Sequence, residues 1–308
     1  MMSTETTKAA RSGDATIDQS PLYETKRHFR RSRFMRAVRN NPLAIFGIFV
    51  AIMFLLIASF PGLFTEHDPI KISPRDRLLV PSPEHLFGTD ELGMDIYARV
   101  IYGARTTSKA IIVVLAIAVG VGSVMGSVAG YFGGWFDNVV MRITDIFIGF
   151  PPLILALAVN AVLGRGFTQT VAAVALTWWP SYARMIRAQI LTVKHEQYVT
   201  AARAAGVRPA GILVRHVLRN SIDPIIVSIT LDVGYIALAT AALSFVGLGA
   251  AHPTPEWGRM VAQGRDYLLV QWWYSTYPGM ALFLLVVSFN LIGELLRDWL
   301  DPSAIRKL

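Results

Sequence analysis

The sequence contains no cysteine among its 308 residues. Structural disulfides, thiolate zinc sites and thiol nucleophiles are therefore excluded. The six histidines are scattered and no HExxH pattern occurs, so the sequence predicts no metal site. The GxxxxGK[ST] phosphate-binding loop is also missing, so we do not expect the chain itself to bind a nucleotide through that motif.

Charged residues are also scarce, at 16% of the chain, whereas 53% of the residues are hydrophobic. The apolar residues are concentrated in runs of about 18 to 25, the length that crosses a bilayer as a helix. Segments between these runs reach only about 45 residues, too short for a separate catalytic domain of usual size. The composition is that of a polytopic membrane protein.

The net charge of +8 is unevenly distributed. Residues 1–42 hold nine Lys/Arg against four Asp/Glu and residues 183–219 hold seven against one, while residues 61–105 hold five against seven. Cationic segments stay on the cytoplasmic side during membrane insertion. The charge therefore predicts topology, not nucleic-acid binding, with the first two segments inside and the third outside.

The apolar runs predict an all-α polytopic fold with six transmembrane helices, at about residues 43–60, 107–131, 144–163, 167–190, 221–244 and 276–296. An even number of spans places both termini in the cytoplasm. We expect residues 1–42 to form a cytoplasmic tail and a basic interfacial helix, or simply a topological anchor, and residues 43–308 to form the membrane domain. Its long loops are the extracytoplasmic segments 61–105 and 245–275 and the cytoplasmic segment 194–220.

Small residues recur every four positions in the second predicted span, at Ala118, Gly122, Gly126, Gly130 and Gly134. Such a stripe lets another helix approach closely in lipid. We expect it to pack within this chain or against another subunit, with a sliding contact as the alternative. Prolines at 151, 152 and 180 predict kinks or broken turns in the third and fourth spans.

The basic segment 198–220 has the pattern of two short helices with a sharp turn between them. Gly206 stands where a helix ends in a left-handed residue, and Pro209 where the next helix begins. The first helix has a small apolar face, made by Tyr198, Ala201, Ala202 and Ala205. The second presents apolar residues, expected to be exposed, among cations: Ile212, Leu213, Val217 and Leu218 among Arg208, Arg215, His216 and Arg219. We interpret this segment as a surface for docking another protein, the alternative being that its arginines only fix topology.

The same segment resembles the EAA loop of ABC importer permeases, a pattern of Glu-Ala-Ala, three residues, Gly, nine residues and Ile-x-Leu-Pro. Ala201, Ala202, Gly206 and Leu218 match it in register, while Thr200 and Arg219 stand where the pattern has Glu and Pro. In that family the loop docks on a cytoplasmic ATPase. The resemblance implies an ATPase-coupling set formed by Tyr198, Ala201, Ala202, Arg203, Gly206, Val207, Arg208, Ile212, Arg215 and His216.

Other motifs extend the resemblance from about residue 30 to the end of the chain. "HLFGTDELGMDIYARVIYGAR", "GYFGGWFD", "RITDIFIGFPPL", "PTPEWGRMVAQGRDYL" and "FNLIGELLRDWLDP" look like the C-type permease subunit of dipeptide, oligopeptide, opine or nickel importers. Met94 is a departure, because an arginine often follows "DELG" in that family. The resemblance implies the type I ABC importer permease fold in a bacterial inner membrane, with peptides as the first choice of substrate and nickel or opines as alternatives.

It also implies the partners: a homologous second permease, two ATPase subunits that bind ATP and Mg²⁺, and an extracytoplasmic substrate-binding protein. The chain itself would bind no cofactor and catalyse no reaction. A secondary carrier would need an inverted repeat and several intramembrane ionisable groups. A membrane enzyme would need a catalytic cluster at membrane depth. Neither pattern is evident in the sequence.

Two sets of residues are further candidates for contact with substrate or partners. Asp232 is the deepest acid in a predicted span, and a charge there costs about 2.5 to 3.5 kcal/mol on insertion scales. We expect it either to line the substrate path or to accept a hydrogen bond from a packed helix. In the loop 245–275, the candidates either dock the binding protein or fix the loop: Trp257, Arg259, Arg265 and Asp266.

Overall fold

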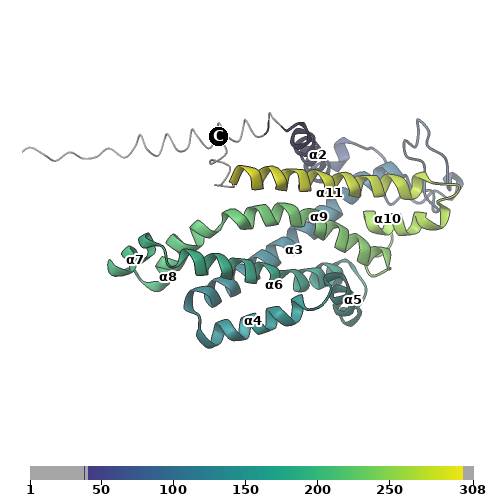
Figure 1. Cartoon of the computed structure of the whole chain (residues 1–308). Helices are drawn as coiled ribbons and strands as arrows, with labels where there is room; N and C mark the ends of the chain where they lie inside the picture. Colours follow the sequence, from purple (N-terminus) through teal and green to yellow (C-terminus); the bar gives the residue numbers. More distant parts are fainter. Residues whose placement is uncertain (1–37, 39–40, 301–308) are drawn as a thin grey trace, which may run out of the picture.

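The computed structural model describes residue 38 and residues 41–300 (Figure 1). The tail and interfacial helix predicted for residues 1–42 thus lie almost wholly outside the described residues. The long α-helices are α2 (Pro42–Ser59), α3 (Ile96–Phe132), α4 (Gly134–Ile148), α5 (Pro152–Leu163), α6 (Phe167–Val193), α9 (Asp223–Phe245) and α11 (Trp273–Leu300). Shorter ones are α7 (Gln197–Ala204), α8 (Pro209–Ile212) and α10 (Trp257–Gly264). Short 3-10 and π turns complete the set: η1 (Pro61–Leu63), η2 (Pro74–Asp76), η3 (Leu213–Val217), η4 (Leu218–Ser221) and η5 (Arg265–Tyr267).

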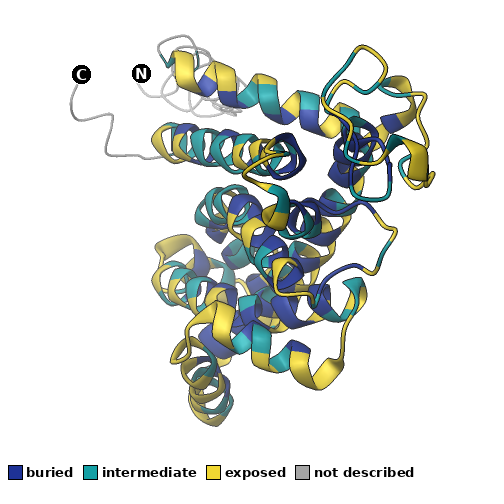
Figure 2. Ribbon diagram, turned by 90° about the vertical axis from the view of Figure 1, so that its right-hand side faces the viewer, coloured by how far each residue is buried: buried dark blue, intermediate teal, exposed yellow. Residues whose placement is uncertain are grey.

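Four of these helices, α2, α3, α9 and α11, are long and apolar enough to cross a membrane. The pair α4 and α5 makes a fifth crossing if the two are counted as one span. The chain is therefore a multi-pass membrane protein. Helix α2 shows the character of such a span most clearly, since large apolar side chains such as Phe46, Phe49 and Leu55 are exposed along it. Figure 2 shows that exposed residues recur along the outer helices of the bundle.

Two predicted spans have different boundaries in the structure. Helix α3 starts at Ile96, not near residue 107, because the Asp95 side chain caps it by accepting from the Ala98 N–H at 2.6 Å. Residues 96–105 of the predicted outer loop are therefore helical. The third predicted span, 144–163, is a broken element, in which α4 and α5 meet at 96° on either side of Pro151. A break at these prolines was predicted, because proline cannot donate the helical hydrogen bond.

The closest packing in the bundle is between α3 and α6, and it is made by the glycine stripe. A Cβ at Gly122 would lie 2.5 Å from the Tyr182 Cβ, and one at Gly126 would lie 2.3 Å from the Ala183 carbonyl oxygen. The predicted packing role is confirmed within this chain for these two glycines and for Gly130. Gly134 does not belong to the stripe, because it is the first residue of α4, with a φ of +68°, and no atom lies within 4 Å of a Cβ placed there.

The remaining long helices are arranged around α3 and α6. Helix α9 contacts both of them, α11 packs on α9 and α2, and α4 lies on the other side against α3 and α6 (Figure 1). Helix α4 is fastened to α6 by ion pairs, since Arg187 makes two hydrogen bonds to Asp137 at 2.5 and 2.6 Å and Arg184 pairs with Asp145.

The loops gather at the two ends of this bundle. Helices α7 and α8 project at one end, whereas α10 and the segment between α2 and α3 lie at the other (Figure 1). The segment 194–220 and the loop 245–275 are thus separated by the length of the helices. This separation matches the opposite sides of the membrane that the order of the predicted spans gives them.

The glycine stripe yields a prediction with a matched control on the same helix. Replacing Gly126 with Ala should destabilise the purified protein by about 1 to 3 kcal/mol, because the new methyl group overlaps the α6 backbone. Gly120→Ala should be neutral or slightly stabilising, because no atom lies within 4 Å of a Cβ there. Thermal unfolding in detergent measures both, and equal melting temperatures for the two variants would contradict the packing role.

Candidate functional site

The segment 194–220 folds as two short helices joined by a glycine turn, as its sequence predicts. The turn after α7 is made by Gly206, which has a φ of +78°. The Gly206 N–H donates to the Arg203 carbonyl at 3.1 Å, and the Val207 N–H donates to the Ala202 carbonyl at 3.2 Å. A residue with a side chain is strained in this left-handed conformation. Pro209 then begins α8, where its missing N–H costs no hydrogen bond.

One side of the segment is anchored to the bundle. Val199 from α7 and Ile212, Leu213 and Val217 from the second half are buried, in a cluster that includes Ile190 of α6. The interpretation of Ile212 and its neighbours as exposed docking residues is therefore wrong. These side chains hold the segment on the end of α6 because apolar groups beside the bundle are more stable out of water.

The other side is exposed and carries most of the predicted coupling set. Val214, 61% exposed, is an apolar residue at this surface that the sequence pattern did not single out. The Asn220 side chain donates to the Tyr198 hydroxyl at 3.1 Å and to the His216 carbonyl at 2.7 Å, which ties the two halves together. We call these outward residues the coupling surface: Tyr198, Ala201, Arg203, Ala205, Val207, Arg208, Val214 and Arg215. Of the other predicted members, Ala202 and His216 are half-buried and Gly206 is the exposed hinge.

At the opposite end, Trp257 is a structural anchor. Its side chain is buried, its indole N–H donates to the Val100 carbonyl of α3 at 2.9 Å, and its ring fills the space beside Gly103. Of the two roles considered for it, the structure favours fixing the loop over docking, because a buried ring offers no surface to a partner.

The other three candidates in this loop differ in exposure. Arg259 is half-buried and donates to the Ala250 carbonyl at 2.5 Å, so it too supports the loop. Arg265 and Asp266 are exposed and pair with each other at 3.1 Å. Only this pair of the four is free to meet a binding protein. The buried Glu256 caps α10 by accepting from the Gly258 and Arg259 N–H groups, and burial raises the pKa of its carboxyl despite these bonds.

A buried ion pair that the sequence did not reveal holds the same end together. Arg99 is fully buried in the first turns of α3, and its Nε lies 3.5 Å from Asp90 Oδ2. The same guanidinium donates to the Pro69 carbonyl at 3.0 Å and the Pro253 carbonyl at 3.2 Å, so it joins three segments. In the sequence, the one sign of this ion pair is that Arg99 ends the motif "DELGMDIYAR". Met94, noted there as a departure, is buried and accepts from Arg99 through its sulfur.

Asp232 lies on α9 and meets α6. The Tyr182 hydroxyl donates to Asp232 Oδ2 at 2.6 Å. A carboxylate at this depth needs such a partner, since an isolated charge is costly away from water. This hydrogen bond supports the packing role, one of the two roles considered for Asp232. The residue is half-buried, and its role in a substrate path stays a prediction.

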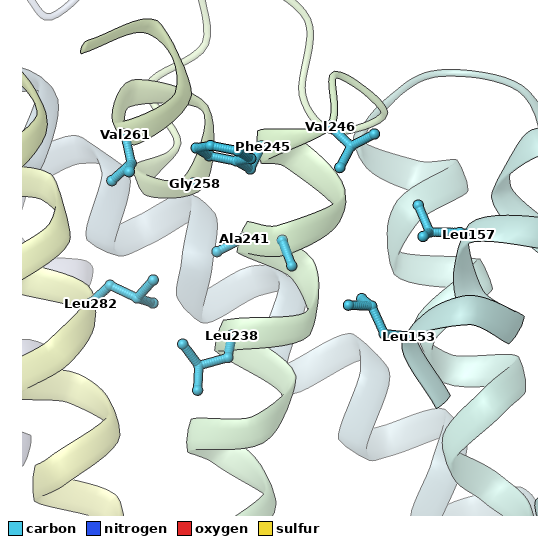
Figure 3. Close-up of a pocket in the computed structure, with 10 residues that line it drawn as sticks. Leu153, Leu157, Leu238, Ala241, Phe245, Val246, Gly258, Val261 and Leu282 are labelled. Atoms are coloured by element: carbon cyan, nitrogen blue, oxygen red, sulfur yellow. The ribbon is translucent and has the colours of Figure 1, made fainter. Parts of the chain in front are cut away.

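Two pockets near α10 differ in the residues that line them. The first, about 340 Å³, is lined by apolar residues of α5, α9, α10 and α11, including Leu153, Phe245 and Leu282 (Figure 3). It offers no charged side chain to orient a polar ligand. The second, about 420 Å³, contains Arg165, His252 and Arg259. Burial and the nearby Arg99 and Arg259 charges lower the pKa of His252.

More than half of the chain matches a family of known proteins. Residues 122–306, which include the glycine stripe, the 194–220 segment and α10, match the family described as "Binding-protein-dependent transport system inner membrane component". The chain belongs to this family. It is a permease subunit of the ABC importer class, and the segment 194–220 is the part that resembles the coupling loop of such permeases.

Relatives match over nearly the whole permease. It is 40% identical over 304 residues to the probable D,D-dipeptide transport system permease protein DdpC of Escherichia coli K12, covering 99% of this chain and 98% of that protein. It is 39% identical to the dipeptide transport system permease protein DppC of Alkalihalophilus pseudofirmus, with 87% and 88% covered. It is 37% identical to the glutathione transport system permease protein GsiD of E. coli, with 88% and 89% covered.

Among solved structures, the permease is similar to a chain of the inward-facing MetNI methionine ABC transporter. The TM-score is 0.49 at 19% identity, covering 67% of this chain and 94% of that one.

The Arg99 to Asp90 pair can be tested by a double substitution. Arg99→Met alone should destabilise the permease by about 3 to 5 kcal/mol, because it leaves the Asp90 carboxylate buried without its charge partner. Adding Asp90→Asn should recover much of this loss, since Asn keeps an oxygen for the Leu92 and Met94 N–H groups. Thermal unfolding of both variants measures the effect. Equal losses would show that the charge pair is unimportant.

Proposed function

We propose that the permease forms half of the translocation path of an ATP-driven importer for dipeptides or oligopeptides in a bacterial inner membrane. Its partners would be a homologous permease, two ATPase subunits and an extracytoplasmic binding protein. The names of the three relatives above, dipeptide and glutathione permeases at 37 to 40% identity, support the substrate class. ATP and Mg²⁺ would be bound by the ATPase subunits, and the permease itself would be non-catalytic.

We assign six spans, with both termini in the cytoplasm. Four apolar helices and the α4 and α5 pair supply five, and α6 is the sixth. At 27 residues, α6 is about 40 Å long and so long enough to cross a bilayer. Its lower apolar content is understandable because α3, α4, α5 and α9 all pack around it and shield it from lipid.

The coupling surface is the observation that carries the mechanism. It combines exposed Tyr198, Val207 and Val214 with arginines, and residues 198–220 contain no acid. Such a surface suits an acidic groove with an apolar floor, because the charges steer and the apolar groups are removed from water. The buried side of the same segment rests on Ile190, so a push on the surface would be transmitted to α6.

Alternating access would follow from this linkage. Closure of the ATPase subunits would displace α7 and α8 together, as one body held by their shared apolar cluster. Helix α6 would move with them, and α3 would follow through the glycine contacts. The path between the two permeases would then open alternately to the outside and the inside.

Isolation of the complex tests the partner assignment. Purified from its native membrane in mild detergent, the permease should bring with it a second permease and ATPase subunits. Val214→Glu should lose the ATPase but keep the second permease, because it places an acid on the basic coupling surface. Val80→Glu, at an equally exposed site (61%) in the outer segment between α2 and α3, is the control and should keep both. Isolation of the wild-type chain without either partner contradicts the proposal.

The hinge at Gly206 gives a sharper test of coupling. Gly206→Val should leave membrane insertion and abundance nearly unchanged, since a Cβ there meets no atom within 4 Å. It should abolish ATP-dependent uptake of a labelled dipeptide while ATP hydrolysis continues, because a β-branched residue at φ +78° reorients α7. Gly211→Ala in α8, with an ordinary 3.4 Å contact to Val207, is the control and should transport normally. Normal uptake by Gly206→Val would show that the turn does not matter.

A further inference from the structure

Three side chains that are distant in the sequence meet at the outer end of the bundle. His67 follows η1, His85 lies in the loop between η2 and α3, and Asp95 is the N-cap of α3. One ligand atom from each lies within 4.8 Å of the other two. Because 18 and 10 residues separate them along the chain, no short metal-binding motif reveals the group.

Two of the three are held in place by the fold. Asp95 Oδ1 accepts from the Ala98 N–H at 2.6 Å, and its Oδ2 lies 2.9 Å from His85 Nδ1. The side chains of Asp95 and His85 are only 4% and 12% exposed. A backbone N–H that orients a carboxylate in this way is the usual outer support of a metal ligand.

The third side chain lies at the surface. The His67 backbone is fixed by its N–H, which donates to Thr65 Oγ1 at 3.2 Å, while its ring is exposed with its centroid 5.5 Å from that of His85. Two fixed ligands and one accessible ligand leave an ion a route from solvent. The exposed ring also has room for the small movement that closes the site.

The donor set indicates the kind of ion. Two imidazole nitrogens and one carboxylate oxygen suit Zn²⁺, whereas Ca²⁺ and Mg²⁺ prefer oxygen ligands alone. Bonds of about 2.0 to 2.2 Å in a tetrahedral site place neighbouring ligand atoms about 3.3 Å apart. The 2.9 Å between His85 and Asp95 is already close to this spacing, and His67 needs only to approach.

We propose that His67, His85 and Asp95 form a Zn²⁺ site with water as the fourth ligand, and that the ion fastens the 61–95 segment to the start of α3. This reverses the sequence prediction of no metal site. The inference does not depend on the transported substrate or on the ATPase. The zinc site would add a second link between this segment and α3. The first link is the buried ion pair between Arg99 and Asp90.

Zinc binding by the intact complex tests the proposal. After chelation and dialysis, titration with ZnCl₂ should show one site per permease that is lost or weakened at least 100-fold in His67→Gln. His67→Cys should restore it, because a thiolate is also a zinc ligand and the chain has no other cysteine. His195→Gln, at an exposed histidine in the 194–220 segment, is the control for surface histidines and should bind as the wild type does. Equal affinity of the wild type and His67→Gln would overturn the site.

Thermal unfolding separates metal binding from a structural role of the histidines. Without metal, His67→Gln should melt at the wild-type temperature, because its ring is exposed. Added ZnCl₂ should raise the melting temperature of the wild type and of His67→Cys but not of His67→Gln. Co²⁺ in place of Zn²⁺ should give the visible absorption of a tetrahedral site. An identical zinc effect in all three proteins would contradict the proposal.

Discussion

The close contact between α3 and α6 is the constraint on which the rest of the structure depends. Lipid gives two apolar helices little reason to associate, so they must gain contact through close backbone approach. Gly122, Gly126 and Gly130 provide it, and the backbone around Ala183 fills the space that side chains would take. The other long helices are then arranged around this pair, and the loops extend from its two ends.

Each end of the pair is joined to a different kind of loop. At one end, an apolar cluster around Ile190 and Ile212 fixes the coupling surface to α6. The Lys194 ammonium, just after α6, joins the same end to α3 by donating to the Gly130 carbonyl at 3.0 Å. At the other end, polar contacts dominate, with Arg99 and Trp257 joining loops to the start of α3. The first loop therefore contacts both helices of the pair, while the second loop is attached to the opposite end of α3.

Several predictions from the sequence were confirmed because they depend on local physics. The turn at Gly206 follows from the freedom of glycine at positive φ, and the break at Pro151 and Pro152 from the missing N–H. The prediction that Ile212, Leu213 and Val217 are exposed was wrong. Apolar residues among arginines give the same sequence pattern whether they face a partner or their own bundle. Only the position of α6 beneath them decides between the two.

The sequence by itself determined the membrane class, the apolar helices, the helix breaks and the family, since these follow from composition, proline and glycine chemistry and motifs along the chain. Only the tertiary structure decided which residues meet. It paired Arg99 with Asp90 and Tyr182 with Asp232, buried Trp257, and brought His67, His85 and Asp95 together. The reason is physical: these partners are 9 to 50 residues apart, and their distance in space depends on how the helices pack and not on spacing along the chain.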